Sequence, residues 1–511
     1  MTAIIAGNYS VATNIIACDL TVNANAVVTI PSGNTVTLTG ALTVETGSSF
    51  TLNNNANLVQ AGITNQNSGN ITVKRTTANL KLQDYVLWSS PTSGTQTLLD
   101  FSPATLTNRF YTFNGAIPPA GQYAVVSPST TTFSTANGYL IRMPSNHPTS
   151  PTSWEGTFTG VPNNGDISVA STSGNFTAVG NPYPSTIDAD QFIIDNAIGN
   201  SDLNSGDGLY FWRKTNNVNQ ATNPTASYAT YTTAGGVKSG GDSLEIVPNG
   251  VIQVGQGFIV KATSSSLNFN NGQRVDNHGN QFLRNATVER HRIWLNLSNA
   301  TGSINQMMVA YMTDATQGID AAIDARYLND SPTALNSLVN NEAFAIQGRS
   351  LPFEASDVVP MQFKAAIAGT YTIAIDHVDG LFSDSQDIFL RDTATGVEHD
   401  LKSSSYTFAS EAGTFTNRFE IVYTAALSTN NPTLDTNSVV IYKNDNQSFV
   451  INTGNTTMSS VKVFDIRGRL LTSVNNINAT QTIVIAGQSN EVLLVQVTSA
   501  DGAIVTKKVV R

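Results

Sequence analysis

Apolar and polar residues alternate along most of the chain, and near the N-terminus this alternation repeats with a fixed period. Segment 20–30, Leu-Thr-Val-Asn-Ala-Asn-Ala-Val-Val-Thr-Ile, aligns with segment 42–52, Leu-Thr-Val-Glu-Thr-Gly-Ser-Ser-Phe-Thr-Leu, at an offset of 22 residues. Short alternating strands separated by Asn and Gly turns at this period are typical of stacked coils in a parallel β-solenoid. We predict such coils over residues 1–75, with a pair of ordinary hairpins as the alternative. The residues predicted to stack inside are Leu20, Val22, Leu42 and Val44.

Residues 76–285 carry short alternating segments between clusters of Gly, Pro and Asn, such as Gly-Tyr-Leu-Ile-Arg-Met-Pro at 138–144. Dense turn signals with few helical windows predict an antiparallel β-sandwich of jelly-roll type. One segment differs from this pattern. Ile187–Asp195 follows Asn-Pro-Tyr-Pro at 181–184 and is predicted to form a short helix beside the sandwich.

Alternating segments continue over residues 286–427, including Gly-Thr-Tyr-Thr-Ile-Ala-Ile at 369–375, and predict an immunoglobulin-like β-sandwich. The next stretch is polar and contains Pro432, which is typical of a linker, and we place this linker at 428–437. Residues 438–511 are then predicted to form a small C-terminal β-sandwich. The whole chain is therefore expected to be all-β.

The composition agrees with a folded extracellular β protein. Of the 511 residues, 40% are hydrophobic and only 12% are charged, so the chain can bury several cores and keep a polar, weakly charged surface. Cys18 is the single cysteine, which excludes an intrachain disulfide and a metal site built on paired thiolates. No stretch of about 18 apolar residues is present, so we expect no transmembrane segment.

Charge is distributed unevenly between the C-terminal segment and the rest. Residues 438–511 hold seven basic and four acidic residues, a net charge of +3, whereas the whole chain carries −10, so residues 1–437 carry −13. A reversal of sign confined to one terminal segment suggests that this segment has its own partner. The acidic pI near 4.9 argues against binding of nucleic acid or of anionic membranes by the whole protein.

Three segments near the C-terminus resemble a known secretion signal. They are Val-Lys-Val-Phe-Asp-Ile-Arg-Gly-Arg-Leu-Leu at 461–471, Val-Leu-Leu-Val-Gln-Val at 492–497 and Ile-Val-Thr-Lys-Lys-Val-Val-Arg at 504–511. Together they resemble the C-terminal sorting domain of cargo proteins of the Bacteroidetes type IX secretion system. The resemblance implies that residues 438–511 are bound by an outer-membrane shuttle barrel and by the type IX translocon. The matching positions are Arg467, Gly468, Arg469, Gly502, Lys507, Lys508 and Arg511.

The last strand offers a physical reason for such binding. Lys507, Lys508 and Arg511 lie on or just after it and can present a basic edge to acidic groups of a partner. The alternative is that charges on an edge strand only prevent aggregation.

Upstream runs, among them Tyr-Val-Leu-Trp-Ser-Ser-Pro at 85–91 and Gly-Asn-Pro-Tyr-Pro at 180–184, are similar to large surface proteins of Flavobacterium-like bacteria. This similarity implies a secreted protein at the outer face of the outer membrane or in the medium. The Pro-Asn-Pro opening of the cleaved class is replaced by Ile-Tyr-Lys-Asn-Asp-Asn at 441–446, which leaves cleavage or retention of the sorting domain open. Residues 1–7 lack the features of a signal peptide, so we expect that a leader has been removed.

One loop has the residue types of a calcium site. Asp202, Asn204 and Asp207 supply oxygen ligands at close spacing, and the glycines of Asp-Leu-Asn-Ser-Gly-Asp-Gly allow a tight wrap. The loop lacks the downstream Glu of an EF-hand, and a plain Asx-type turn is the alternative. Asp314, Asp320 and Asp324 form a second, weaker acidic set.

Aromatic residues suggest a possible carbohydrate site. Trp154, Tyr210 and Trp212 are candidates for stacking on sugar rings. In a strand, Tyr210 and Trp212 share one face and Phe211 takes the other, so at least one of these faces must belong to the core. Burial is the alternative for each ring.

Motifs for catalysis are absent. The five histidines are far apart, and the sequence contains no G-x-S-x-G elbow, no P-loop and no paired cysteine motif. We therefore expect a non-enzymatic surface protein that acts in adhesion, with gliding-related adhesion as the sharpest version and a surface glycan or a protein as ligand. The alternative is a carbohydrate-binding accessory protein for capture of extracellular polysaccharide.

Overall fold

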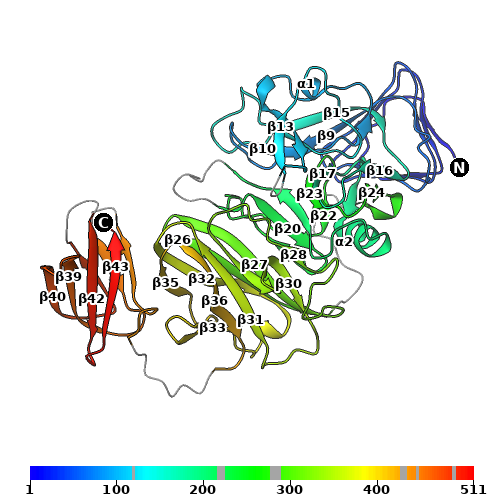
Figure 1. The fold of residues 1–511 in the computed structure, drawn as a ribbon. Coiled ribbons are helices and arrows are strands. Elements are labelled where there is room, and N and C mark those ends of the chain that lie inside the picture. The colour runs from blue at the N-terminus through cyan, green and yellow to red at the C-terminus, as the bar shows by residue number, and fades with distance from the viewer. Residues whose placement is uncertain are drawn as a thin grey trace.

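The computed structural model describes residues 1–117, 121–215, 225–276, 289–425, 434–444, 448–485 and 491–510. Regular structure in these residues is almost entirely β-strand with a few short helices, so the all-β prediction is confirmed. From the N-terminus to the C-terminus, Figure 1 shows a narrow solenoid, a region of small sheets, a large curled sheet and a separate C-terminal module. No helix in the described ranges is long and apolar enough to cross a membrane.

The N-terminal residues form a parallel β-solenoid. Leu20 pairs with Leu42 and Val22 with Val44, which is the 22-residue offset of the sequence repeat. All four side chains are buried, and the parallel pairing rules out the alternative of two hairpins. The three stacks are β1 (Ala3–Ile5), β3 (Leu20–Val22) and β6 (Leu42–Val44); β2 (Ile15–Ala17), β5 (Thr35–Leu38) and β8 (Asn57–Gln60); and β4 (Val27–Ile30), β7 (Ser49–Leu52) and β9 (Ile71–Thr76).

Strand β9 joins the solenoid to the region that follows. It pairs in parallel with β7 and, along its other edge, antiparallel with β15 (Glu155–Pro162), which in turn pairs with β11 (Thr92–Ser93). One apolar cluster runs from the solenoid side chains to Trp88, Phe158 and Val254. The boundary predicted at residue 75 therefore falls inside a continuous sheet and a shared core.

Two sheets lie against each other in the middle region, with Leu87, Leu140, Tyr210 and Ile259 packed in one apolar cluster between them. The strands of the first sheet all come from residues 85–142 and those of the second from residues 176–261, so the two sheets do not exchange strands as the two sheets of a jelly roll do. The first sheet has the order β10 (Tyr85–Trp88), β14 (Tyr139–Arg142), β12 (Phe110–Asn114) and β13 (Gln122–Val125). The second has the order β17 (Phe176–Gly180), β23 (Gly257–Lys261), β19 (Leu209–Trp212), β20 (Tyr228–Thr232) and β21 (Gly235–Val237).

Smaller elements complete this region. The predicted helix is present as α2 (Ala189–Ile193), which continues as the π-helical turn η2 (Ile194–Gly199). The carboxylate of Asp188 caps it by accepting hydrogen bonds from the backbone N–H groups of Asp190 and Gln191. The other elements are β16 (Ile167–Ala170) with β24 (Ser266–Phe269); β22 (Val251–Ile252), β18 (Thr186–Asp188) and β25 (Arg274–Val275); and α1 (Leu98–Phe101), η1 (Thr107–Arg109) and η3 (Asn271–Gln273).

The next part is a single eleven-stranded sheet instead of the two separate sheets of an immunoglobulin-like sandwich. Bulges at Trp294/Leu295, Leu297/Ser298 and Met361/Phe363 bend its long strands, so the sheet curls over its own apolar core. Its order is β34 (Val397–Asp400), β33 (Phe389–Asp392), β36 (Gly413–Val422), β31 (Val358–Ala365), β29 (Ala334–Val339), β30 (Glu342–Arg349), β27 (Gly302–Met312), β26 (Arg290–Asn299), β32 (Gly369–Val378) and β35 (Tyr406–Ser410), with β28 (Ala325–Arg326) paired to β30 and the 3-10 turn η4 (Gly380–Ser383) beside it.

The C-terminal module is a small two-sheet β unit with its own core. Buried side chains from both sheets, including Ile451, Val463 and Val495, form one apolar cluster. Part of the predicted linker, residues 428–433, lies outside the described residues. The sheets are β37 (Val440–Lys443), β38 (Phe449–Asn452) and β41 (Gln481–Val484); and β40 (Leu470–Ala479), β39 (Met458–Asp465), β42 (Val492–Ser499) and β43 (Ile504–Val510).

Replacing Leu42 with Ala tests the stacked core of the solenoid. Leu42 is fully buried between coils, so we expect the variant to lower the free energy of unfolding by about 2–5 kcal/mol. Thr43→Ala is the matched control on the outward side of the same strand and should change it by about 0.5 kcal/mol or less. Urea denaturation followed by circular dichroism measures both, and equal losses would contradict the inward stacking.

Candidate functional site

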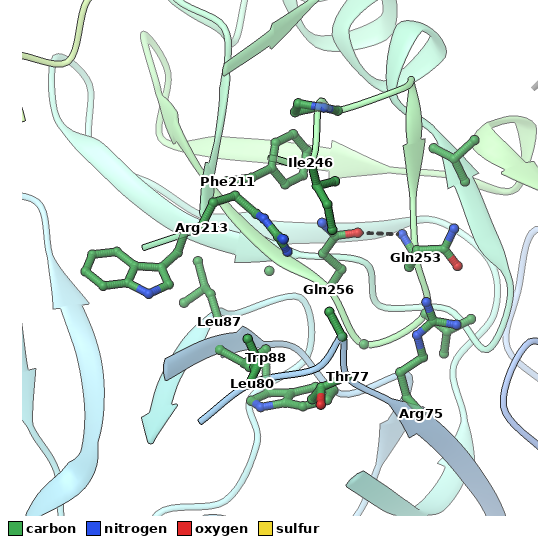
Figure 2. A pocket seen from close by; sticks show the side chains of 18 of the residues that line it. Arg75, Thr77, Leu80, Leu87, Trp88, Phe211, Arg213, Ile246, Gln253 and Gln256 are labelled. Atoms are coloured by element: carbon green, nitrogen blue, oxygen red, sulfur yellow. Dashed lines mark hydrogen bonds between the residues drawn. The ribbon is translucent and has the colours of Figure 1, made fainter. Parts of the chain in front are cut away.

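A cavity of about 320 Å³ lies in the middle region, between the start of β10 and the strand and loop segments around β19, β22 and β23. Figure 2 shows Leu80, Leu87 and Trp88 on one side of it and Phe211 and Arg213 on the other. Three stretches that are distant in the sequence form its walls: residues 75–88, 211–215 and 246–257. A cavity at such a junction, with an apolar floor and a few polar groups, is the usual form of a small-molecule site.

The floor of the cavity is apolar because its side chains also belong to the cores of the adjoining sheets. Trp88 is 4% exposed and packs edge-to-face on Phe158 and Trp154. Phe211 is also 4% exposed and belongs to the core beneath β19. These shared contacts hold the floor in place without a ligand.

The charged groups in the lining are all cationic. Arg75, Arg213 and Lys214 line the cavity, and no Asp or Glu is among its described lining residues. Arg213 is neutralised from outside the cavity, since its Nε donates to a carboxylate oxygen of buried Asp242 at 2.9 Å. Lys214 lies within the electrostatic influence of Asp330, so Arg75 is the lining cation for which no carboxylate partner is found among the described residues.

Arg75 owes its position to the alternation of strand β9. Val73 points into the core, and Arg75, two residues further along, lies on the same side of the strand. Its Nη1 donates hydrogen bonds to the amide oxygens of Asn54 and Asn55 in the last solenoid turn. Burial lowers the pKa of this guanidinium to about 10. No carboxylate among the described residues pairs with it to offset that effect.

Neutral polar groups complete the lining. The indole Nε1 of Trp212 is buried and has no hydrogen-bond acceptor in the described part of the chain. The side-chain oxygen of Gln256 accepts a hydrogen bond from the backbone N–H of Gln253 at 2.9 Å, as the dashed line in Figure 2 marks. This bond fixes the loop and leaves the amide nitrogens of both glutamines as donors.

The structure separates the three rings that were candidates for sugar stacking. Tyr210 is completely buried, and its hydroxyl donates to Asp207 and to the carbonyl of Arg326, so it has no ring face for a sugar. Trp154 is half-buried among Trp88 and Phe101. Only Trp212 combines partial exposure with a place in the cavity wall.

The candidate calcium ligands are engaged by protein groups. A carboxylate oxygen of Asp207 lies 3.4 Å from Arg326 Nη1 and 3.9 Å from Lys261 Nζ, and it also accepts from the side-chain amide of Asn204. Asp202 instead accepts from Asn268 at 3.0 Å. Cationic side chains from β23 and β28 thus already lie beside Asp207, and calcium binding there stays a prediction. No cluster of three His, Cys, Asp or Glu suited to a metal occurs within the described ranges.

The second acidic set forms a hydrogen-bonded turn. Asp324 is fully buried and accepts hydrogen bonds from the backbone N–H groups of Gly348 and Asp320, at 2.5 and 2.6 Å. Burial nevertheless raises the pKa of the Asp324 carboxyl from 3.8 to about 7. Asp314 lies apart on the surface.

The residues of the predicted export signal fall at both ends of one sheet. Arg467, Gly468 and Arg469 form the turn between β39 and β40, where Gly468 has a φ of +81° and the Asp465 carboxylate accepts from the backbone N–H groups of both arginines. Gly502, with a φ of +92°, is in the turn between β42 and β43 at the opposite end. Arg511 lies outside the described residues.

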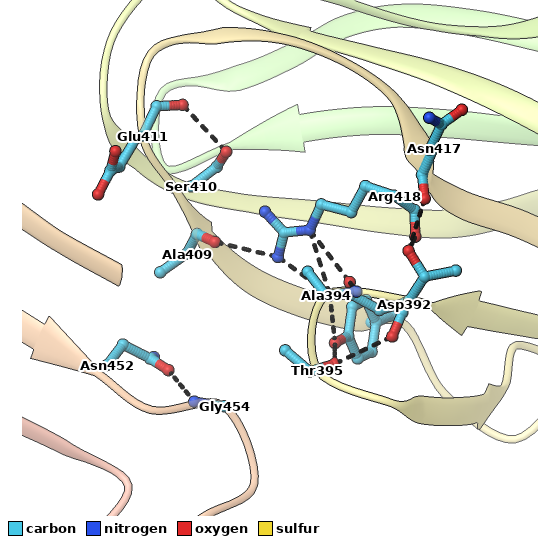
Figure 3. Close-up of polar contacts among 12 residues, drawn as sticks. Asp392, Ala394, Thr395, Ala409, Ser410, Glu411, Asn417, Arg418, Asn452 and Gly454 are labelled. Atoms are coloured by element: carbon cyan, nitrogen blue, oxygen red, sulfur yellow. Dashed lines mark hydrogen bonds and ion pairs between the residues drawn. The ribbon is translucent and has the colours of Figure 1, made fainter. Parts of the chain in front are cut away.

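Lys507 and Lys508 point to opposite sides of β43. Lys507 Nζ lies 3.3 Å from a carboxylate oxygen of Glu411 on the curled sheet, while Lys508 is exposed. The curled sheet holds a buried ion pair near Glu411. Arg418 donates to both carboxylate oxygens of Asp392 and to the carbonyl of Ala409, two residues before Glu411 (Figure 3). This pair anchors the loop that meets the C-terminal module.

Sequence reasoning missed Arg75, Gln253 and Gln256. Arg75 carries a weak signal, because it stands at an inward position of the strand Ile-Thr-Val-Lys-Arg-Thr, where an apolar residue is expected. The two glutamines carry no such signal, since only the fold brings residue 253 next to residue 75.

Comparison with known protein families gives one clear result. Residues 2–423 match the family described as a domain of unknown function, DUF8693. The chain belongs to the DUF8693 family. Residues 427–511 match a second family, also described as a domain of unknown function, DUF8694. The DUF8693 match therefore ends and the second begins just before the predicted linker.

The other comparisons add little. No curated protein matches this DUF8693 chain. Among solved structures, one titled "Biofilm associated protein - BSP domain" aligns over 84% of this chain and 96% of its own, with 9% identity and a TM-score of 0.14. A TM-score of that size does not establish a shared fold.

The raised pKa of Asp324 predicts a dependence of stability on pH. The folded protein holds this proton up to about pH 7, whereas the unfolded chain releases it near 3.8, so the folded state binds more protons in between. The contribution of Asp324 is thus most favourable below 3.8 and is lost as pH rises through about 7, by a few kcal/mol in order of magnitude.

Urea denaturation of the wild type and of Asp324→Asn across this pH range measures the effect. The Asn side chain accepts only one of the two backbone hydrogen bonds at any pH, so the slope of stability against pH is the readout. We expect the variant to flatten that slope and exposed Asp314→Asn to leave it unchanged. Identical slopes for the wild type and Asp324→Asn would contradict the raised pKa.

Proposed function

We propose that this protein is secreted to the cell surface through its C-terminal module, residues 438–511, and acts there in adhesion. The observation that carries the proposal is the self-contained fold of that module. Its two sheets enclose a core that is distinct from the core of the curled sheet. A module with its own core and a net charge opposite to the rest of the chain is suited to a partner of its own.

The strand register gathers the basic residues of the module at one end. Asp465, at the start of the Arg467–Arg469 turn, pairs with Leu493, and Leu493 pairs with Val509. The turn therefore lies at the same end of the sheet as Lys508. Strand β43 is an edge of its sheet, so a partner strand can pair with its free backbone groups while acidic groups meet this basic end.

The type IX shuttle barrel and translocon are the partners we propose for this surface. Support comes from the resemblance of segments 461–471, 492–497 and 504–511 to the sorting domain of that system. Of these segments, the turn at 467–469 and Lys508 are exposed in the folded module, as recognition before or during export requires.

Adhesion at the outer surface, in its sharpest form gliding-related adhesion, is the role we propose for residues 1–425. An elongated solenoid joined to broad sheets offers a large, weakly charged contact surface. The second candidate is a carbohydrate-binding accessory protein, and the observation that favours it is the cavity beside Trp212.

A pull-down from Flavobacterium-type outer membranes tests the delivery role. We expect the full chain to recover an outer-membrane barrel partner and a chain ending at Asn437 to lose it, because the basic turn and β43 are removed. Mass spectrometry of the eluates identifies the partner. Equal recovery by both proteins would contradict delivery through this module.

Point variants test the charges of the basic end while the module stays in place. Arg467→Gln combined with Lys508→Gln removes two exposed charges at that end and should weaken recovery. Lys443→Gln removes one exposed charge from the other sheet of the module and is the matched control. Comparable loss in both would indicate nonspecific attraction between charges.

A further inference from the structure

The cavity beside strand β9 is positive in a protein that is otherwise acidic. The chain has 36 acidic and 26 basic residues, yet the described lining contains three cations and no carboxylate. Concave, weakly polar walls focus the field of such charges and raise the local concentration of anions. The charge pattern therefore selects for an anionic ligand.

Arg75 is the group most ready to bind that anion. A guanidinium has five N–H donors, and the hydrogen bonds of Arg75 to described residues start from Nη1 alone. Its two acceptors are neutral amide oxygens, so its charge has no opposite partner. Burying an unpaired charge is costly, and a ligand carboxylate meeting the free edge of the guanidinium offsets that cost through a charge-assisted, bidentate contact.

Neutral donors lie in the same cavity. The side-chain amide nitrogens of Gln253 and Gln256 belong to its wall, and the hydrogen bond between these two residues uses the side-chain oxygen of Gln256 and not a side-chain amide nitrogen. A ligand with several oxygen atoms, such as hydroxyl groups, satisfies these donors together.

The remaining walls require a ring-shaped body on the ligand. Leu80, Leu87 and Trp88 provide apolar surface that inorganic phosphate or sulfate would leave uncovered. The half-exposed Trp212 ring offers a face for the C–H side of a sugar. A volume of about 320 Å³ is at the lower end of the range for small-ligand sites.

We propose that this cavity binds an acidic sugar of the uronic acid class, with the carboxylate on Arg75, the hydroxyl groups on Gln253 and Gln256, and the ring against the apolar floor. The site lies within residues 75–257, so its ligand binding does not depend on the C-terminal module. It also holds whether or not the export route proposed above is correct.

Isothermal titration calorimetry with the full-length protein tests the site. The probes are the trisaccharides of galacturonate, glucuronate and mannuronate, each compared with its methyl ester, which keeps the ring and removes the charge. We expect at least one free acid to bind at least about tenfold more tightly than its ester, with an affinity that falls as salt is raised.

Two variants and a control assign the contact. Arg75→Gln should lower the affinity at least about tenfold. Lys74→Gln removes the neighbouring charge on the outward side of β9, where Lys74 pairs with Glu155, and should leave the affinity within about twofold. Gln253→Leu keeps a side chain of similar size in the cavity wall but removes the amide donor, so it should weaken binding without changing the salt dependence.

The outcomes are distinct because folding is measured separately, by the thermal unfolding midpoint of each variant. Preference for the free acid, lost in folded Arg75→Gln and kept in Lys74→Gln, supports the site. Equal binding of acid and ester, unchanged binding by Arg75→Gln, or no binding of any trisaccharide at millimolar concentration overturns it. If Arg75→Gln does not fold, Gln253→Leu is the deciding variant: weaker binding supports the site, and unchanged binding overturns it.

Discussion

Strand β9 is the element on which the architecture depends, because its two edges pair in opposite senses. Along one edge it closes a parallel solenoid, and along the other it starts an antiparallel sheet. Ile71 and Val73 place their side chains in the core common to both. The chain has a single cysteine and no disulfide, so backbone pairing and this shared core must hold the two regions together. Arg75, near the end of that strand, lines the cavity at this junction.

What the sequence predicts well is periodic and local. The sequence repeat of Leu20 and Leu42 predicts the strand register, because the equivalent positions of successive coils stack. The short helix is predictable because Asp188 is a residue type that caps helix N-termini. The curled sheet was not predictable in the same way. Whether long strands form one bent sheet or two flat ones depends on bulges such as Met361/Phe363, which leave no mark in the alternation of residues.

The candidate site also contains residues whose role depends on the fold and not on the local sequence. Tyr210 and Trp212 are both aromatic and lie on the same face of β19, where both pack against the neighbouring sheet. Tyr210 is nevertheless fully buried, whereas Trp212 is half-buried and lines the cavity. Gln253 and Arg75 line the same cavity only because strands far apart in the chain pair with one another. Residues of this kind become candidates only once the fold is known.

The ion pair between Lys507 and Glu411 joins the terminal strand to the curled sheet. One ammonium group cannot meet the carboxylate of its own chain and that of another molecule in the same position at once. With this ion pair in place, Lys507 is engaged within the chain, and Lys508, on the other side of β43, is the lysine of this strand that faces solvent. The accessibility of the terminal strand therefore depends on the packing of the module against the curled sheet.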